Sequence, residues 1–382
     1  MPTTILMYAQ DTKGLGHIRR SITIARSLLE LRDDVAVLLA TRSSWPGAFE
    51  LGPRFEVLRL PHRFVEPAAT PEEQPREAVA ARGLRQALLR EAVVHLRPSV
   101  ILIDNEPLGV KGEMREAIEA APPSTRIVYG MRDVVDTPER THAKWDELGV
   151  PEVLLRRFDR ILVYGHPDLF DTLGTYELDP ALVARAGYNG YVCAPPERID
   201  GAGFRARHGL GDAPFVLATG GGGIDAFPVL RLAVEAARLV PGCPRLLLVT
   251  GPLMPEEDRA AVAELAAPDG HLVAREVEML PALAEAAAAV TMGGYNTVIE
   301  ALMLGRRPII VPRATHKQEQ LIRARAFADR GLVRYLEPEA TTAETLAREI
   351  AAELADPGRI DATRYLDPHG RRAAETLLGL VP

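Results

Sequence analysis

The sequence predicts two α/β domains, each built on a parallel sheet with helices on both faces. Short apolar runs alternate with helical patterns through most of the 382 residues, and apolar strands separated by helices are typical of parallel sheets. The pattern begins afresh after residue 213, and each half opens with a strand, a glycine-rich loop and a helix. We expect an N-terminal domain over 1–187, a linker over 188–213 and a C-terminal domain over 214–382, whose last helix is free to pack back on the first domain.

Composition narrows the class of protein. The chain is 47% hydrophobic and 25% charged, as in soluble globular proteins. A formal net charge of -7 argues against a nucleic-acid partner. No apolar run approaches the ~20 residues of a membrane helix, and the N-terminus lacks a signal-peptide pattern. Cys193 and Cys243 have no metal or disulfide spacing, so we expect a cytoplasmic protein without membrane attachment.

The N-terminal half should hold six strands. The first is the apolar run 3–9, after which Ile18, Ile22, Ala25 and Leu29 recur at helical spacing. The other expected strands are 35–40, 55–60, 100–104, 126–131 and 160–165.

A long helix is expected over about 76–97. Its apolar positions at helical spacing are Leu84, Leu88, Ala92 and Leu96. We interpret them as a core-facing stripe, the alternative being an apolar and basic membrane-binding patch.

The C-terminal half repeats the design with five expected strands, at 215–223, 245–251, 271–277, 287–294 and 307–312. Ligands of open α/β sheets bind at the carboxyl ends of the strands. We therefore expect function in a cleft lined by the loops of both domains.

Four consecutive glycines, Gly220 to Gly223, follow the first of these strands. Backbone N–H groups of such a loop can approach an anion closely, and the next helix adds partial positive charge. The plain alternative is a turn. The N-terminal pair Gly14 and Gly16 is no dinucleotide fingerprint, because Arg19 stands where the third glycine belongs, and neither loop has the lysine of a nucleoside-triphosphate loop.

The stretch 290–332 carries the densest pattern. Gly293 and Gly294 precede a helix expected to begin near Asn296 or Thr297, and Glu300 stands three residues after Thr297. This spacing fits either a capping box or a first-turn carboxylate that accepts hydrogen bonds from a ribose.

The residues "GGYNTVIEALMLGRRPIIVP" and "HKQEQLIRARAFADRGL" resemble the C-terminal donor-binding domain of family 28 glycosyltransferases. The resemblance covers about the last 170 residues and is specific over 290–332. "GLGHIRRS" resembles the N-terminal domain of that family and also a nucleotide-sugar hydrolase of pseudaminic acid biosynthesis, while residues 129–171 resemble a bacterial group of predicted glycosyltransferases. Membership implies the GT-B fold of two Rossmann-like domains, metal-independent chemistry and inversion at the anomeric carbon.

The resemblance also implies roles for individual residues. Glu300 would bind the donor ribose, Gln320 the donor sugar, and the backbone at Val277 and Met279 the base. The diphosphate would lie against the glycine loops and the turn at 293–297, so that the nucleotide-sugar set is completed by Gly14, Gly16, Gly220, Gly221, Gly222, Gly223, Gly293, Gly294, Asn296 and Thr297. The family's arginine near the linker has no counterpart around 190–194, and Arg198 or Arg205 would have to substitute.

His17 is the expected catalytic base. Histidine accepts protons near neutral pH, and this one would reach an acceptor hydroxyl across the cleft; the alternative is a helix residue that merely packs. Asp104 ends a strand and is a candidate second catalytic group, or a capping carboxylate. Acceptor-side candidates are Asn105, Glu106, Arg132 and Asp133, of which the last two are alternatively an ion pair.

The expected function is sugar transfer from a nucleotide-diphosphate donor, most simply a UDP-sugar, to an acceptor hydroxyl or amine on a small molecule or glycan. The absence of Asp-x-Asp agrees with a reaction that needs no metal or other cofactor. Two alternatives stay open: a nucleotide-sugar hydrolase or epimerase of the same fold, and a non-catalytic auxiliary protein.

Overall fold

The computed structural model describes residues 3–9, 16–43, 51–61, 73–194, 199–312 and 318–381, with the side chains of 73–78 left out. The chain forms two compact units. Unit 1 comprises Met1–Val192 and Asp367–Pro382, and unit 2 comprises Cys193–Leu366. The stretch 188–213, expected as a linker, contains strand β8 (Tyr191–Cys193) and helix α8 (Gly201–Arg207).

Unit 1 is built on a seven-stranded parallel sheet of order β3-β2-β1-β4-β5-β6-β7. The strands are β1 (Thr3–Ala9), β2 (Val35–Thr41), β3 (Phe55–Arg59), β4 (Val100–Asp104), β5 (Arg126–Arg132), β6 (Arg160–Tyr164) and β7 (Ala186–Tyr188).

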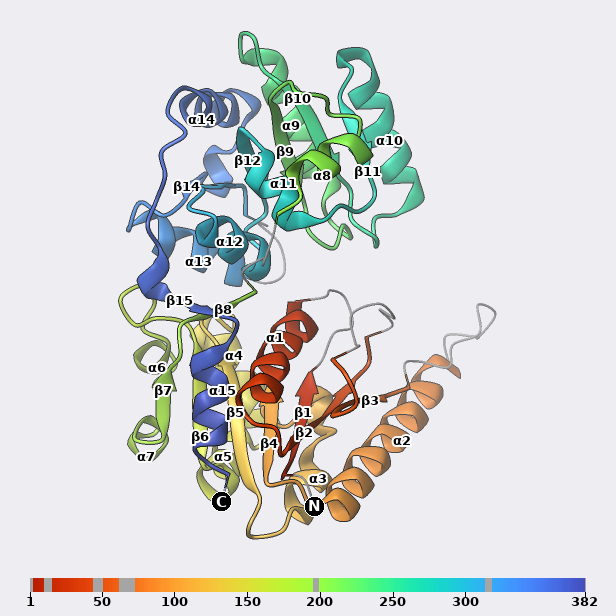
Figure 1. The fold of residues 1–382 in the computed structure, drawn as a ribbon, viewed down its shortest axis with the longest axis vertical. Helices are drawn as coiled ribbons and strands as arrows, with labels where there is room; N and C mark the ends of the chain where they lie inside the picture. The colour runs from red at the N-terminus through yellow and green to blue at the C-terminus, as the bar shows by residue number, and fades with distance from the viewer. Residues whose placement is uncertain are drawn as a thin grey trace. The chain divides into compact units, whose positions relative to one another are not determined.

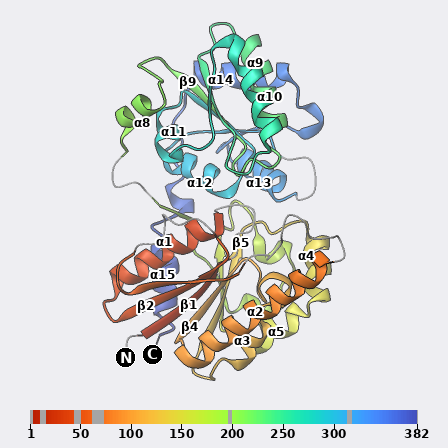
Figure 2. The ribbon, with the colours of Figure 1, turned by 90° about the vertical axis from the view of Figure 1, so that its right-hand side faces the viewer.

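Helices cover both faces of this sheet (Figures 1 and 2). Helices α1 (Gly16–Leu31) and α15 (Arg371–Leu378) lie side by side on one face, where they share a buried cluster. The second cluster takes in side chains from the remaining longer helices, which are α2 (Glu73–Leu96), α3 (Arg115–Ala120), α4 (Pro138–Glu147) and α5 (Val150–Arg157). Short helices α6 (Thr172–Thr175) and α7 (Pro180–Val183) follow β6.

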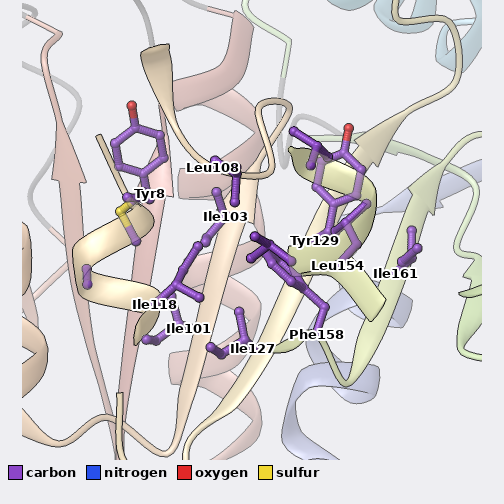
Figure 3. Close-up of a cluster of buried hydrophobic side chains, with 14 of the residues drawn as sticks. Tyr8, Ile101, Ile103, Leu108, Ile118, Ile127, Tyr129, Leu154, Phe158 and Ile161 are labelled. Atoms are coloured by element: carbon purple, nitrogen blue, oxygen red, sulfur yellow. The ribbon is translucent and has the colours of Figure 1, made fainter. Parts of the chain in front are cut away.

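Strand β1 shows why the sequence reads as a continuous apolar run. Side chains alternate between the two faces of a strand, so Ile5 and Met7 join the α1 side while Leu6 and Tyr8 join the other side. Figure 3 shows the second cluster, to which Tyr8, Ile101, Ile103 and Leu108 all belong. Because both faces of the sheet are buried, apolar residues do not alternate with polar ones along the strand.

Helix α2 is where the expected apolar stripe was wrong. Leu84 and Leu96 are exposed, whereas the buried stripe lies one position along, at Ala81, Arg85, Leu89 and Val93. The reason is Arg85, whose Nε donates a 2.7 Å hydrogen bond to Oε2 of the fully buried Glu113. Because the buried face of α2 contains a charged residue, the pattern of apolar residues in the sequence did not identify it.

Unit 2 has a six-stranded parallel sheet of order β11-β10-β9-β12-β13-β14. Its strands are β9 (Phe215–Thr219), β10 (Arg245–Val249), β11 (Leu272–Ala274), β12 (Ala288–Thr291), β13 (Ile309–Ile310) and β14 (Arg334–Tyr335). Besides α8 its helices are α9 (Phe227–Leu239), α10 (Glu256–Ala266), α11 (Met279–Glu285), α12 (Tyr295–Met303), α13 (Glu319–Ala328) and α14 (Ala343–Ala355).

Every strand expected from the sequence is present, so the two-sheet α/β fold is confirmed. The strands missed are β7, β8, β14 and β15 (Leu366–Pro368), each two or three residues long. Such short runs give no periodic signal. Strands β8 and β15 pair with each other in a separate two-stranded sheet.

The order of strands reverses at one point in each sheet. In unit 1 the reversal lies between β1 and β4, and in unit 2 between β9 and β12. Connections leave in opposite directions from such a pair, which opens a crevice at their carboxyl ends where α/β proteins bind ligands. Each unit therefore has one predictable place for a site.

Candidate functional site

The site of unit 1 lies at its strand-order reversal. His17 is the second residue of α1, which follows β1, and Asp104 is the last residue of β4. Arg20 stands three residues after His17, so both side chains project from one face of the helix. Three ionisable side chains, two from the helix after β1 and one from the end of the neighbouring strand β4, therefore lie close together.

These three side chains form a tight cluster. Nδ1 of His17 lies 2.6 Å from Oδ2 of Asp104. Arg20 donates from Nη2 to both carboxylate oxygens, at 2.8 Å each, and from Nε to Oδ1 at 3.1 Å. The Asp104 and Arg20 side chains are 2% exposed, while His17 is 20% exposed. Only the histidine reaches solvent.

The charge state of Asp104 fixes the tautomer of His17. Burial alone would raise the pKa of the Asp104 carboxyl, but the charges and hydrogen bonds of Arg20 and His17 hold it below its usual value. An ionised carboxylate is acceptor-only, so the 2.6 Å contact places the proton of neutral His17 on Nδ1. The lone pair is then on Nε2, the atom a general base needs.

Arg20 is a buried helix arginine, although arginines on helices are usually solvated. In the structure its guanidinium carbon lies 4.6 Å from the centre of the Tyr164 ring at the end of β6. Gly130 on β5 makes room for that ring, since a Cβ there would collide with the Tyr164 hydroxyl. The His-x-x-Arg spacing and the strand-end Asp104 were the signals available, but only the fold joins them.

The acceptor-side candidates end neighbouring strands. Asn105 follows Asp104 with φ of +65°, and Glu106 forms an ion pair with Lys144. Arg132 and Asp133 at the end of β5 are 8% and 0% exposed. The hydroxyl of Thr172 donates to the Asp133 backbone carbonyl, so Asp133 is built into the core beside the site.

The four-glycine loop of unit 2 follows β9 at the other reversal. A Cβ on Gly220 would collide with the Ala226 side chain, and one on Gly223 with the Thr250 carbonyl oxygen. Gly221, at φ +69°, would meet nothing within 4 Å. Packing therefore requires Gly220 and Gly223, whereas Gly221 borders open space.

The second glycine turn leads directly into α12. Gly294 is the N-cap, and no side chain caps the helix. The helix begins at Tyr295, ahead of the expected start, so the capping-box interpretation of Thr297 and Glu300 is wrong. A Cβ on Gly294 would meet open space, and the N–H groups of the first turn, including those of Asn296 and Thr297, have no acceptor within the helix.

Glu300 lies in the second turn of α12 and is 6% exposed. It was expected in the first turn, and the early helix start moves it deeper. Gln320 is the second residue of α13 and lies beside Gly293, whose added Cβ would stand 3.8 Å from the Gln320 Cβ. Strands β12 and β13 thus bring the 293–300 turn and Gln320 together.

Val277 and Met279 lie where β11 leads into α11, and both pack partly buried against the core of unit 2. Arg205 is engaged elsewhere: it donates to Glu285 and to the carbonyls of Gly211 and Ala213. Arg198 and Gly14 lie outside the described residues. In the described ranges, no cluster of three or more histidine, cysteine, aspartate or glutamate residues has metal-site geometry.

Comparison with solved structures defines the class. The glycosyltransferase of kitacinnamycin superposes with a TM-score of 0.68 at 20% identity, over 100% of both chains. A UGT transferase from Siraitia grosvenorii in complex with UDP gives 0.60 at 12% identity, over 100% of both chains. MurG from Acinetobacter baumannii gives 0.60 at 15% identity, over 99% of this chain and all of that one. The protein has the GT-B fold.

Sequence similarity to known proteins is concentrated in unit 2. Residues 221–365 match the model of the Glycosyltransferase family 28 C-terminal domain. A curated relative, the NDP-glycosyltransferase YjiC of Bacillus licheniformis, is 30% identical over 106 residues. That match spans 28% of this chain and 26% of the relative. Among the described helices none is long and apolar enough to cross a membrane.

Proposed function

We propose that the protein is a glycosyltransferase that moves a sugar from a nucleoside-diphosphate donor, held by unit 2, to a hydroxyl or amine acceptor. The observation that carries the proposal is the His17–Asp104 pair, with its 2.6 Å contact and its partly exposed imidazole. The family match of residues 221–365 and the NDP-sugar chemistry in the name of the curated relative support the donor class.

In this proposal Nε2 of His17 removes the proton of the acceptor as its oxygen or nitrogen attacks the anomeric carbon. The bond from that carbon to the diphosphate breaks, and the configuration inverts. Asp104 holds the imidazole in the Nδ1–H tautomer and stabilises the imidazolium that forms. General base catalysis of this kind contributes about 10²- to 10⁴-fold.

The leaving diphosphate carries the developing negative charge. We assign its stabilisation to backbone N–H groups at Gly221 and at the start of α12, where the N-terminal partial charge of the helix is favourable. Glu300 and Gln320 are assigned to the ribose and the sugar, and the stretch Val277 to Met279 to the base. No step in this proposal requires a metal ion.

The base is tested with His17→Ala. We incubate the variant with UDP-glucose, UDP-N-acetylglucosamine, dTDP-glucose or GDP-mannose and a panel of phenol and sugar acceptors, and measure products by mass spectrometry. We expect transfer to fall at least 100-fold while calorimetric affinity for UDP is kept. His95→Ala, at an exposed histidine paired with Glu91, is the matched control. Transfer at the wild-type rate by His17→Ala would refute the base.

The donor site is tested with Gly294→Ala. Its φ of -59° and the open space around it mean that an added methyl leaves the fold intact. That methyl lies at the N-terminus of α12, so we expect UDP affinity to fall about tenfold or more with an unchanged melting temperature. Gly83→Ala, in open space on α2, is the control. Unaltered UDP binding by Gly294→Ala would contradict the assignment of the diphosphate to this turn.

A nucleotide-sugar hydrolase is the second candidate, because the same imidazole base would take a proton from water equally well. Donor incubated without acceptor separates the two. Rapid stoichiometric release of free sugar supports hydrolysis, and slow release that acceptor accelerates supports transfer.

A further inference from the structure

We propose that Arg20 is a positioning residue of the His17–Asp104 pair: it clamps the carboxylate that orients the imidazole and places a balancing positive charge beside both groups. The inference rests on the proposed function only for its kinetic consequence. The effect of Arg20 on the carboxylate and the imidazole can be measured in the protein without any substrate.

The clamp follows from the hydrogen bonds. Three N–H donors reach the two oxygens of Asp104, two from Nη2 and one from Nε. A guanidinium that binds both oxygens fixes the plane of a carboxylate, whereas a single contact leaves it free to rotate. The carboxylate plane directs Oδ2 at Nδ1 of His17 and so fixes the direction in which Nε2 points.

The guanidinium is itself held from a second side. Its contact with the Tyr164 ring and its burial give it one position. Arg20 lies on α1, Asp104 on β4 and Tyr164 on β6. Three elements therefore determine the orientation of one imidazole.

The counter-charge effect follows from the distances to His17. A lone aspartate at 2.6 Å would strongly favour the imidazolium. Here a guanidinium neutralises that aspartate, and its Nη2 also lies 3.0 Å from Nδ1 of His17. Because Nδ1 carries its proton toward Asp104, this contact brings two N–H groups together and disfavours a further positive charge on the ring.

Among the described residues, the other charged neighbours do not replace Arg20. The first turn of α1 has no acidic side chain, and the helix N-terminus itself disfavours a cation at His17. On the β5 side of Asp104, burial first and then the charges of Glu106 and Asp104 raise the pKa of Tyr129, while Arg132 opposes them. Tyr129 is therefore neutral, and Arg20 is the cation hydrogen-bonded to the carboxylate.

The test is an NMR titration of His17 in protein labelled on its histidines, assigned by comparison with His17→Gln. In wild-type protein we expect the Nδ1–H tautomer at neutral pH. In Arg20→Gln, which removes the counter-charge, we expect the midpoint of ring protonation to rise by about one pH unit or more. Arg20→Lys keeps the positive charge but loses the guanidinium that binds both carboxylate oxygens. In this variant the midpoint of His17 ring protonation should stay near the wild-type value, while kcat falls and KM is kept.

Arg26→Gln is the matched control, because Arg26 is an exposed arginine on the same helix. Arg20→Met replaces the glutamine variant if the latter does not fold, since its apolar side chain packs on the Tyr164 ring. A midpoint in the folded neutral variant equal to that of Arg26→Gln overturns the proposal. The titration needs no turnover, so a shifted midpoint without any sugar transfer would refute the proposed function and leave the role of Arg20 standing.

Discussion

Nδ1 of His17 and Oδ2 of Asp104 lie 2.6 Å apart although 87 positions separate the residues in the sequence. The pairing arises because β1 and β4 are neighbours in the sheet, with Tyr8 opposite Ile103. The loop after β1 leads into α1, and β4 ends at Asp104. The catalytic proposal depends on β1 and β4 being neighbouring strands.

Asp104→Asn should lower kcat by about 10²- to 10⁴-fold. The asparagine amide does not fix the Nδ1–H tautomer, so Nε2 is no longer reliably the basic atom. Donor KM should stay within a factor of three, because unit 2 is untouched. Steady-state kinetics measure this, with Asp34→Asn at the opposite end of the sheet as control. A kcat near the wild-type value would mean that the carboxylate does not orient the base.

The same residue should govern stability in acid. The pKa of Asp104 is lowered in the folded protein, so its contribution is fully present above the unfolded-state value of about 4 and is lost as the pH falls through the folded value. Urea unfolding of wild type and Asp104→Asn should show a difference in unfolding free energy at pH 7 that shrinks at pH 3. A difference that grows in acid would reverse the assigned sign.

Arg85→Met should destabilise unit 1 by about 3 to 5 kcal/mol, because it leaves the carboxylate of Glu113 buried without its cation. Glu113 would keep only the 2.5 Å hydrogen bond from the Tyr8 hydroxyl. Arg90→Met, at an exposed arginine of the same helix, should cost less than about 1 kcal/mol. Chemical denaturation compares the two, and the double variant Arg85→Met/Glu113→Leu should recover part of the loss.

Leucines of α2 should differ in cost according to the corrected stripe. Leu89→Ala, at a fully buried position, should cost about 2 to 5 kcal/mol. Leu84→Ala, at a side chain that is 45% exposed, should cost less than about 1 kcal/mol. Equal melting temperatures for the two variants would contradict the orientation of the helix.

Gly223→Ala should impair folding, whereas Gly294→Ala should not. The φ of Gly223 is +99°, and the Thr250 carbonyl stands where the new methyl would go, so we expect a loss of several kcal/mol. Thermal unfolding of the two variants separates glycines required by packing from those left open for a ligand. A Gly223→Ala protein as stable as wild type would remove that distinction.

The sequence carried most of the fold because both sheets are buried on two faces, which produces apolar runs that alternate with helices. His17 and Asp104 were each recognisable at a strand end, since glycines or polar residues interrupt the apolar pattern there. The contact of these two residues with Arg20 was not recognisable from the sequence, because it depends on the order of the strands in the sheet rather than on the spacing of residues along the chain. The helix start at Tyr295 was also missed, since a glycine N-cap leaves no side-chain signal for the helix boundary.

The return of the chain to unit 1 has a consequence for biosynthesis. Helix α15 supplies Ala373, Ala374 and Leu377 to the same buried cluster as α1, yet all of unit 2 is synthesised between them. At a translation rate of about 5 to 20 residues per second, the first unit waits on the order of ten seconds for its last helix. During that interval the α1 side of its sheet offers an uncovered apolar strip to the chaperones of the cell.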